Sequence, residues 1–350
     1  MRDRVASLLH RAGALDALMR LRKVASLPSI PIVTYHQIAD RDPSYPYDPD
    51  VADATPEQFR RQMELLARTC TSVSIDDLVR AVDGEPLPRN AVMITFDDGY
   101  QSCHDIALPI LKRVGMKATF FIPTMFVTDR KLFWWERVCL MLSLAKTDTC
   151  TITYPTTLEI DRRTPKLRRQ LVNLVKDTPA LDVDRFLDEL AAALDLRWNA
   201  QIEAAYADGL IMTWDQIRAL ANAGMDIESH GRRHRVLQTL DAVQLHDELF
   251  GSKDDLEAQL DRPVRAIAYP VGRRINHEPR IREACAAAGY RIGMSNQSGV
   301  SMLWPTALRG MLPVDPFDVS RLATDRDMSD ALFLSQIAIP GFAYPGNHPH

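Results

Sequence analysis

The sequence predicts an α/β protein: a barrel of about seven parallel strands with a helical insertion. Short apolar runs alternate with segments of helical periodicity, which is the pattern of βα units and a parallel sheet. About seven such units favour a barrel over the alternative, an open doubly wound sheet. No Gly-x-Gly-x-x-Gly sequence follows an apolar run to mark a dinucleotide site. With 350 residues, the chain is long enough for one barrel and an insertion.

Apolar runs mark the candidate strands. They are Pro31–His36, Ala91–Phe96, Lys117–Ile122, Met225–Ser229, Arg265–Tyr269, Tyr290–Met294 and Arg309–Val314. Thr55 precedes Gln58 and Thr213 precedes Gln216 at capping-box spacing, so helices are predicted to begin after these threonines. The predicted barrel domain spans residues 30–345.

Two segments lie outside this alternation. Residues 1–29 contain a predicted amphipathic helix from Arg4 to Leu21, with six basic and two acidic residues in or beside it. Its basic face could meet an anionic membrane surface, and docking on its own domain is the plainer alternative. About a hundred residues separate the third and fourth strands, far more than one crossover needs, so an insertion is predicted at about 129–210.

Composition excludes some partners and chemistries. Lys and Arg (42) are balanced by Asp and Glu (46), so the chain has no overall basic field to hold nucleic acid. The five cysteines are scattered without a Cys-x-x-Cys pair, which indicates neither a disulfide framework nor a thiolate zinc site. Because no signal-peptide or membrane-spanning pattern is found, the expected location is cytoplasmic, with peripheral contact at the inner face of the membrane as an option.

Two adjacent carboxylates follow the second candidate strand. Asp97 and Asp98 stand in the run TFDDGY, at the carboxyl end of the strand, where α/β barrels assemble their sites. Adjacent side chains at a strand end point in different directions, so one can bind a metal ion while the other accepts a proton. A plain strand-terminating turn is the alternative.

Two histidines follow the fourth candidate strand. His230 and His234 are four residues apart, so they share one face of a helical turn and can present ring nitrogens to one cation. Asp98 could supply a third ligand. Two exposed surface histidines are the alternative, but the position of both motifs at strand ends favours a shared site.

The fifth candidate strand ends in Tyr269, Pro270, Val271 and Gly272. Such a turn could provide a wall for a substrate ring and amide donors for an oxyanion, and a plain strand–turn is the alternative. The candidate substrate-binding residues are Tyr269, Pro270, Tyr100 and Arg309.

Together these runs resemble the polysaccharide deacetylase family, the NodB-homology domains grouped as carbohydrate esterase family four. The resemblance is carried by TFDDGY at 95–100, the runs at 105–112 and 118–121, HxxxH at 230–234 and AYPxG at 268–272. It implies a deformed (β/α) barrel and one divalent metal ion held by Asp98, His230 and His234. Zinc is the expected ion, with cobalt or nickel as alternatives, and Asp97 is the implied catalytic base.

The first candidate strand, which ends in His36, looks like the N-terminal strand of the circularly permuted poly-N-acetylglucosamine deacetylases. That resemblance implies that His36 is the general acid, because the segment 315–340 has no histidine where many family members carry Leu-x-His. An imidazole with an ordinary pKa near 6.5 is suited to donate a proton near neutral pH. A histidine that caps the strand or binds the following loop is the alternative.

The chain departs from the family pattern at three positions. Gly231 stands where members usually have Ser or Thr, and Glu228 stands where they have a small residue. Ala268 replaces an arginine that orients the base in many members. The candidates to replace that arginine are Arg265, Arg273 and Arg309.

The resemblance implies a metal-dependent deacetylase that hydrolyses the N-acetyl group of an amino sugar. The expected partner is an N-acetylated glycan, either a polysaccharide or a lipid- or nucleotide-linked intermediate. The alternatives are an amidohydrolase for a non-sugar small amide and a catalytically silent glycan-binding module. Retention of Asp97 beside Asp98 argues against the silent module, because such a site has no chemical need for a second carboxylate.

Overall fold

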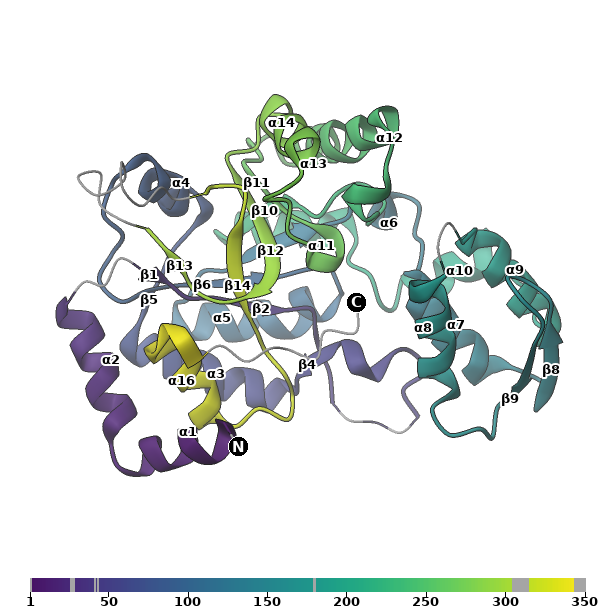
Figure 1. The fold of residues 1–350 in the computed structure, drawn as a ribbon, viewed down its shortest axis with the longest axis horizontal. Coiled ribbons are helices and arrows are strands. Elements are labelled where there is room, and N and C mark those ends of the chain that lie inside the picture. Colours follow the sequence, from purple (N-terminus) through teal and green to yellow (C-terminus); the bar gives the residue numbers. More distant parts are fainter. Residues whose placement is uncertain are drawn as a thin grey trace. The chain divides into compact units, whose positions relative to one another are not determined.

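The computed structural model describes residues 2–25, 29–40, 42, 44–178, 181–303 and 315–342, and its elements are labelled in Figure 1. The chain folds as two compact units. The first comprises Met1–Asp40, Val51–Thr128 and Met212–His350, and the second comprises Arg41–Asp50 and Asp129–Ile211.

The first unit contains a closed barrel of parallel strands, as predicted (Figure 1). In order around the barrel, the seven strands within the described residues are β2 (Ile32–Tyr35), β14 (Val319–Ala323), β12 (Ile292–Ser298), β11 (Ala266–Ala268), β10 (Asp226–Ser229), β7 (Thr119–Ile122) and β6 (Ala91–Phe96). Strand β6 pairs with β2 and closes the barrel, and β5 (Thr71–Ser72) lies beside β6. Since all neighbouring pairs are parallel, the carboxyl ends of the strands meet at one rim.

Six of the seven predicted strands are confirmed, and the seventh stays untested. The predicted strand Arg309–Val314 lies outside the described residues, and the strand that closes the barrel beside β2 is β14. Its sequence, Val-Ser-Arg-Leu-Ala, carries Arg321 at a buried position. A charged residue inside a buried strand breaks the apolar run by which a strand is recognised.

Helices follow the barrel strands and, except for the last one, connect them. They are α3 (Pro56–Thr69), α4 (Ile75–Asp83), α5 (Leu108–Val114), α6 (Thr124–Thr128), α11 (Trp214–Asn222), α12 (Ala242–His246), α13 (Ser252–Leu260), α14 (Pro279–Ala287) and α16 (Asp330–Ala338). The capping predictions are confirmed: Thr55 accepts a hydrogen bond from the Gln58 N–H, and Thr213 forms a capping box with Gln216. Apolar side chains from the strands and from α4 form a buried core.

Shorter elements complete the first unit. Strand β1 (Ser29–Ile30) pairs antiparallel with β13 (Ser301–Met302), and β3 (Gln37–Ile38) pairs parallel with β4 (Ala52–Ala54). Two π-helical turns, η2 (Cys103–Ala107) and η4 (Asp247–Gly251), precede α5 and α13.

The N-terminal segment forms two helices where one was predicted. Helices α1 (Arg2–Arg11) and α2 (Ala14–Ala25) are separated at Gly13, whose φ of 69° is left-handed and ends the first helix. Both helices contact α16, and Leu15 and Met19 are buried. Within the described residues, no helix is long and apolar enough to cross a membrane.

The second unit is mainly helical. It contains α7 (Trp134–Leu144), an antiparallel pair of β8 (Thr149–Ile152) and β9 (Leu158–Asp161), α8 (Leu167–Asp177), α9 (Val183–Ala193) and α10 (Ala200–Ala207). Its own core includes Trp135, which stacks on Phe133 with 4.6 Å between ring centroids.

Candidate metal and catalytic site

The carboxylate and histidine motifs leave the barrel at the same rim. Asp97 and Asp98 follow β6, and His230 follows β10, with β7 between these two strands. The backbone turns sharply at Asp98 and Gly99, whose φ values are 72° and 73°. A left-handed aspartate stores strain, typically about 1–3 kcal/mol, and such strain clusters at functional sites.

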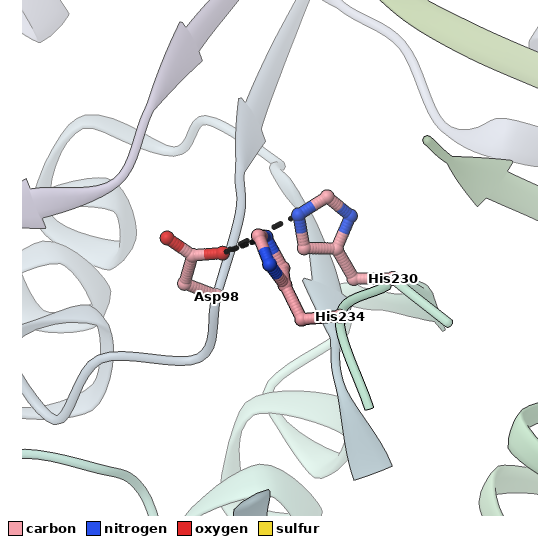
Figure 2. Close-up of side chains that lie close together, drawn as sticks. All are labelled: Asp98, His230 and His234. Carbon is pink, nitrogen blue, oxygen red and sulfur yellow. Dashed lines mark ion pairs between the residues drawn. The ribbon is translucent and has the colours of Figure 1, made fainter. Parts of the chain in front are cut away.

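Asp98, His230 and His234 lie close together, as Figure 2 shows. Asp98 Oδ1 is 3.3 Å from Nε2 of each histidine, and all three groups are buried or nearly so. The two imidazole rings are inclined at 69° to each other with 4.8 Å between their centroids. The sequence prediction that these side chains meet is consistent with this geometry.

The donor atoms of this cluster fit a divalent cation. The Nδ1 atom of His230 is 2.9 Å from the Ala268 carbonyl oxygen, which can only accept a hydrogen bond, so Nδ1 carries the proton and Nε2 presents its lone pair. Asp98 Oδ1 is buried and accepts no hydrogen bond from any described group. Two imidazole nitrogens and one carboxylate oxygen that converge in this way are a typical ligand set for zinc and its neighbours.

The electrostatics keep both aspartates ionised. Burial by itself would raise the pKa of Asp98, but its close contacts with His230 and His234 hold that pKa well below its usual range. Burial would likewise raise the pKa of Asp97, and the charge of Arg321 is the main effect that lowers it instead.

Asp97 is held by an arginine that the sequence analysis missed. The Arg321 guanidinium donates to both carboxylate oxygens of Asp97 at 2.7 Å, and both side chains are completely buried. Arg321 also donates to Asn296 Oδ1 at 2.5 Å and to the Ser295 carbonyl at 3.3 Å. This bidentate pair fixes the orientation of the Asp97 carboxylate.

Two of the predicted replacements for the orienting arginine, Arg265 and Arg273, are therefore wrong. Arg265 forms an exposed ion pair with Asp76, and Arg273 is exposed. Arg309 lies outside the described residues. The signal that could have found Arg321 is its position in the short, mainly apolar run Val319–Ala323, where a charge is unusual unless it has a buried partner.

His36 stands beside the carboxylates at the rim. Strand β2 pairs with β6 so that Tyr35 lies opposite Phe96, and the Asp97 N–H donates to the Tyr35 carbonyl at 2.9 Å. His36 is 5% exposed, and its Nδ1 is 2.9 Å from Asp53 Oδ2. Asp53 also accepts the His36 backbone N–H at 2.5 Å.

The charges around His36 favour its protonated form. Burial by itself would lower the pKa of His36, but the charge and hydrogen bond of Asp53, with smaller effects of Asp98 and Asp97, raise it to about 9. Asp53 was not predicted as a site residue, since it lies in a loop-like, Asp-rich segment whose other carboxylates give the same sequence signal.

The predicted substrate-binding residues are buried where the structure describes them. The Tyr269 hydroxyl donates to the Phe317 carbonyl at 2.9 Å, and the Tyr269 N–H donates to Met294 at 2.9 Å. The Tyr269 N–H is thus paired within the sheet, and the expectation that amide groups of the turn near Tyr269 bind an oxyanion stays a prediction. Tyr100 and Pro270 are also buried, and contact of these residues with substrate stays a prediction.

The fold and the site define a class of protein: a closed (β/α) barrel with a buried Asp-His-His cluster and an arginine-held aspartate at the carboxyl ends of its strands. The sequence profile of the polysaccharide deacetylase family matches residues 84–172 and 184–293, more than half of the chain. The chain belongs to the polysaccharide deacetylase family.

Individual relatives agree with this assignment. YxkH of Bacillus subtilis (strain 168), named as a polysaccharide deacetylase, is 31% identical over 90 residues, which cover 26% of this chain and 31% of YxkH. The chain thus matches about a third of the length of that relative. The deacetylase PplD of Streptococcus pyogenes, solved with acetate, is 20% identical with a TM-score of 0.57 and covers 89% of this chain and 99% of PplD. IcaB from Ammonifex degensii is 16% identical with a TM-score of 0.52, and the match covers 89% of this chain and 97% of IcaB. These structures confirm the predicted fold.

Proposed function

We propose that this protein is a metal-dependent deacetylase that hydrolyses the N-acetyl group of an amino sugar in a glycan. The observation that carries the proposal is the convergence of Asp98, His230 and His234 beside Asp97, a carboxylate that Arg321 holds in place. Family membership supports the deacetylase reaction. An N-acetylated polysaccharide or a lipid- or nucleotide-linked glycan is the proposed substrate.

Asp98, His230 and His234 would hold the metal ion, with zinc as the proposed ion. A divalent cation held by two imidazoles and one carboxylate can polarise an amide carbonyl and lower the pKa of bound water. Asp97 lies 3.9 Å from His230 Nε2 and is the base that accepts a proton from the attacking water. Arg321 keeps Asp97 ionised and fixes the direction in which its oxygens point.

His36 is the proposed general acid for the departing amine. Asp53 engages Nδ1 of the ring, and Nε2 is the ring atom proposed to donate a proton to substrate. With a pKa of about 9, His36 is protonated at neutral pH and can serve as an acid in each turnover. Base and acid are thus distinct groups whose surroundings push their pKa values in opposite directions.

The proposed location is the cytoplasmic face of a membrane, with contact through α1 and α2. Four of the six large apolar side chains that are exposed among the described residues lie on these helices: Val5, Leu8, Leu21 and Val24. Exposed basic residues lie on the same two helices: Arg2, Arg4, Arg11, Arg20 and Lys23. An apolar surface bordered by positive charge is complementary to an anionic bilayer.

Acetate release tests the proposal. The purified chain is incubated with N-acetylated oligosaccharides, lipid-linked N-acetylated sugars and small cyclic amides, with and without zinc, cobalt or nickel. Release of acetate from a sugar substrate that requires added metal supports the proposal. Hydrolysis of the cyclic amides alone would indicate the amidohydrolase alternative. Glycan binding without release of acetate in any metal would indicate the silent module.

A further inference from the structure

We infer that Glu248 is a positioning residue for the histidine pair. Its carboxylate holds the loop between His230 and His234 in the conformation that directs both rings at Asp98. The inference rests on the proposed metal site. Glu248 lies in the π-helical turn η4, on a different element from both histidines, and is 1% exposed.

Side-chain oxygens accept the backbone N–H groups of this loop. The Gly231 N–H donates to Ser229 Oγ at 3.1 Å. The N–H groups of Arg232 and Arg233 both donate to Glu248 Oε2, at 2.7 and 2.9 Å. A carboxylate that accepts two consecutive N–H groups makes charge-assisted bonds, which are stronger than neutral ones, and fixes the bend of the backbone between them.

The opposite side of the loop is held by the chain that follows β7. The carbonyl groups of Gly231 and Arg232 accept hydrogen bonds from the N–H groups of Thr124 and Met125, at 3.4 and 2.9 Å. The loop is therefore hydrogen-bonded on one side to the backbone of Thr124 and Met125 and on the other side to the Glu248 carboxylate. Without the carboxylate, two buried or half-buried N–H groups would lose their partner, and the loop would have to move to satisfy them.

The missing side chain at position 231 fits the same arrangement. Gly231 has a left-handed φ of 75°, and a Cβ atom built on it would lie 2.9 Å from Glu248 Oε2 and 3.4 Å from Pro270 Cγ. The carboxylate thus occupies the space that a side chain would need. Glycine at 231 and glutamate at 248 are a matched pair in this chain.

The turn that carries Glu248 is itself anchored to the end of β10. Ser252 Oγ contacts the Glu248 carbonyl at 2.6 Å, Ser229 Oγ at 2.8 Å and the Tyr290 hydroxyl at 3.1 Å. Ser229 is the last residue of β10 and precedes His230. These buried contacts fix Glu248 relative to the histidine loop, and π-turns of this kind are frequent at functional sites.

Zinc affinity tests the inference. Full-length Glu248→Ala, Glu248→Asp, Glu248→Gln and wild type are prepared free of metal, and zinc binding is measured by competition with a chromophoric chelator. Asp254→Ala is the matched control, since Asp254 is an exposed carboxylate on the following helix. Hydrogen exchange of the peptide that spans 229–236, measured without metal, reports on the loop itself.

Glu248→Ala and Glu248→Asp should weaken zinc binding roughly 10–100-fold, the usual effect of losing a partner that orients a ligand. Both should speed exchange at Arg232 and Arg233. Glu248→Gln should stay within a few-fold of wild type, because one amide oxygen in place of Oε2 can accept both bonds. Glu248→Asp keeps the charge and carries the test should Glu248→Ala fail to fold.

Unchanged zinc affinity in Glu248→Asp, or a Glu248→Gln loss as large as that of Glu248→Ala, would overturn the inference. Acetate release is assayed separately on the same proteins. Zinc binding that depends on Glu248 without release of acetate would refute the proposed function and leave the positioning role standing. Zinc-dependent acetate release with no effect of Glu248→Asp on zinc binding would refute the positioning role of Glu248 and leave the proposed function standing.

Discussion

Replacing Asp53 by Asn should lower the alkaline pH above which the rate of acetate release falls. The substitution keeps the size of the side chain but removes the negative charge 2.9 Å from His36 Nδ1. A general acid must be protonated, so activity falls as the pH rises through its pKa. In wild type this limb is expected near pH 9, the value to which Asp53 and the other carboxylates raise the pKa of His36.

The expected size of the shift follows from the charges around His36. An opposite charge in contact with an ionisable group typically changes its pKa by about 1–3 units, so the alkaline limb of Asp53→Asn should move down by about that much. The raised pKa also contributes to stability. Relative to the ordinary value of 6.5, a pKa of about 9 corresponds to roughly 3 kcal/mol. This stabilisation is complete below pH 6.5 and is lost as the pH rises through 9.

Two measurements check this reasoning. The first is the pH dependence of kcat for acetate release by wild type and Asp53→Asn. The second is urea unfolding at pH 6 and pH 10, where the variant should be less stable than wild type at pH 6 and closer to it at pH 10. Asp105→Asn is the matched control, because Asp105 contacts His104 at 2.7 Å in an exposed pair. An alkaline limb at the same pH in Asp53→Asn and wild type would refute the assignment of His36 as the acid.

Three further predictions follow from the site and the N-terminal helices. Metal analysis should find about one equivalent of zinc in wild type and none in His230→Ala or His234→Ala, and full metal content in these variants would contradict the ligand assignment. Asp97→Asn should keep the metal, but its kcat for acetate release should fall roughly 10²–10⁴-fold. Arg321→Met should lower the free energy of unfolding in urea by about 3–5 kcal/mol, because it leaves the buried Asp97 charge unpaired. Arg265→Met, which breaks an exposed pair, should change this free energy little, and equal effects of the two substitutions would contradict the role of Arg321. The double variant Leu21→Glu, Val24→Glu should bind less to vesicles that contain phosphatidylserine, as measured by sedimentation of the protein with the vesicles. Val243→Glu, at an exposed residue on α12, is the control, and unchanged binding of the double variant would refute the membrane contact.

The parts of the site that are local in sequence could be predicted, and the parts made by distant contacts could not. Asp97 and Asp98 are adjacent, and His230 and His234 are four apart, so a strand-end motif was enough to find them. Arg321, Asp53 and Glu248 carry no motif of their own. Asp53 and Glu248 become recognisable only from the partners to which the fold brings them, and the role of Arg321 follows only from its pairing with Asp97, 224 residues away in sequence.

The two halves of the site depend on the barrel in different ways. The cluster of Asp98, His230 and His234 needs only β6, β7 and β10, which are consecutive neighbours in the sheet. The proton-transfer groups need the barrel to close. His36 is brought beside Asp97 by the pairing of β2 with β6, and Arg321 reaches Asp97 from β14, which pairs with the other edge of β2.

Buried hydroxyl groups at Thr34 stabilise the pairing of β2 with its neighbours β14 and β6. The Thr324 hydroxyl donates to the Thr34 carbonyl at 2.6 Å, and the Thr34 and Thr95 hydroxyls are 3.1 Å apart. They tie β2 to the end of β14 on one side and to β6 on the other, one residue before each strand delivers Tyr35 and Phe96 to the rim. In the proposed mechanism, a chain whose strand β2 failed to pair with β6 would lack the general acid, because His36 follows β2. In that mechanism, metal binding and catalysis are therefore separable, and catalysis is the property that requires β2 to pair with both β6 and β14.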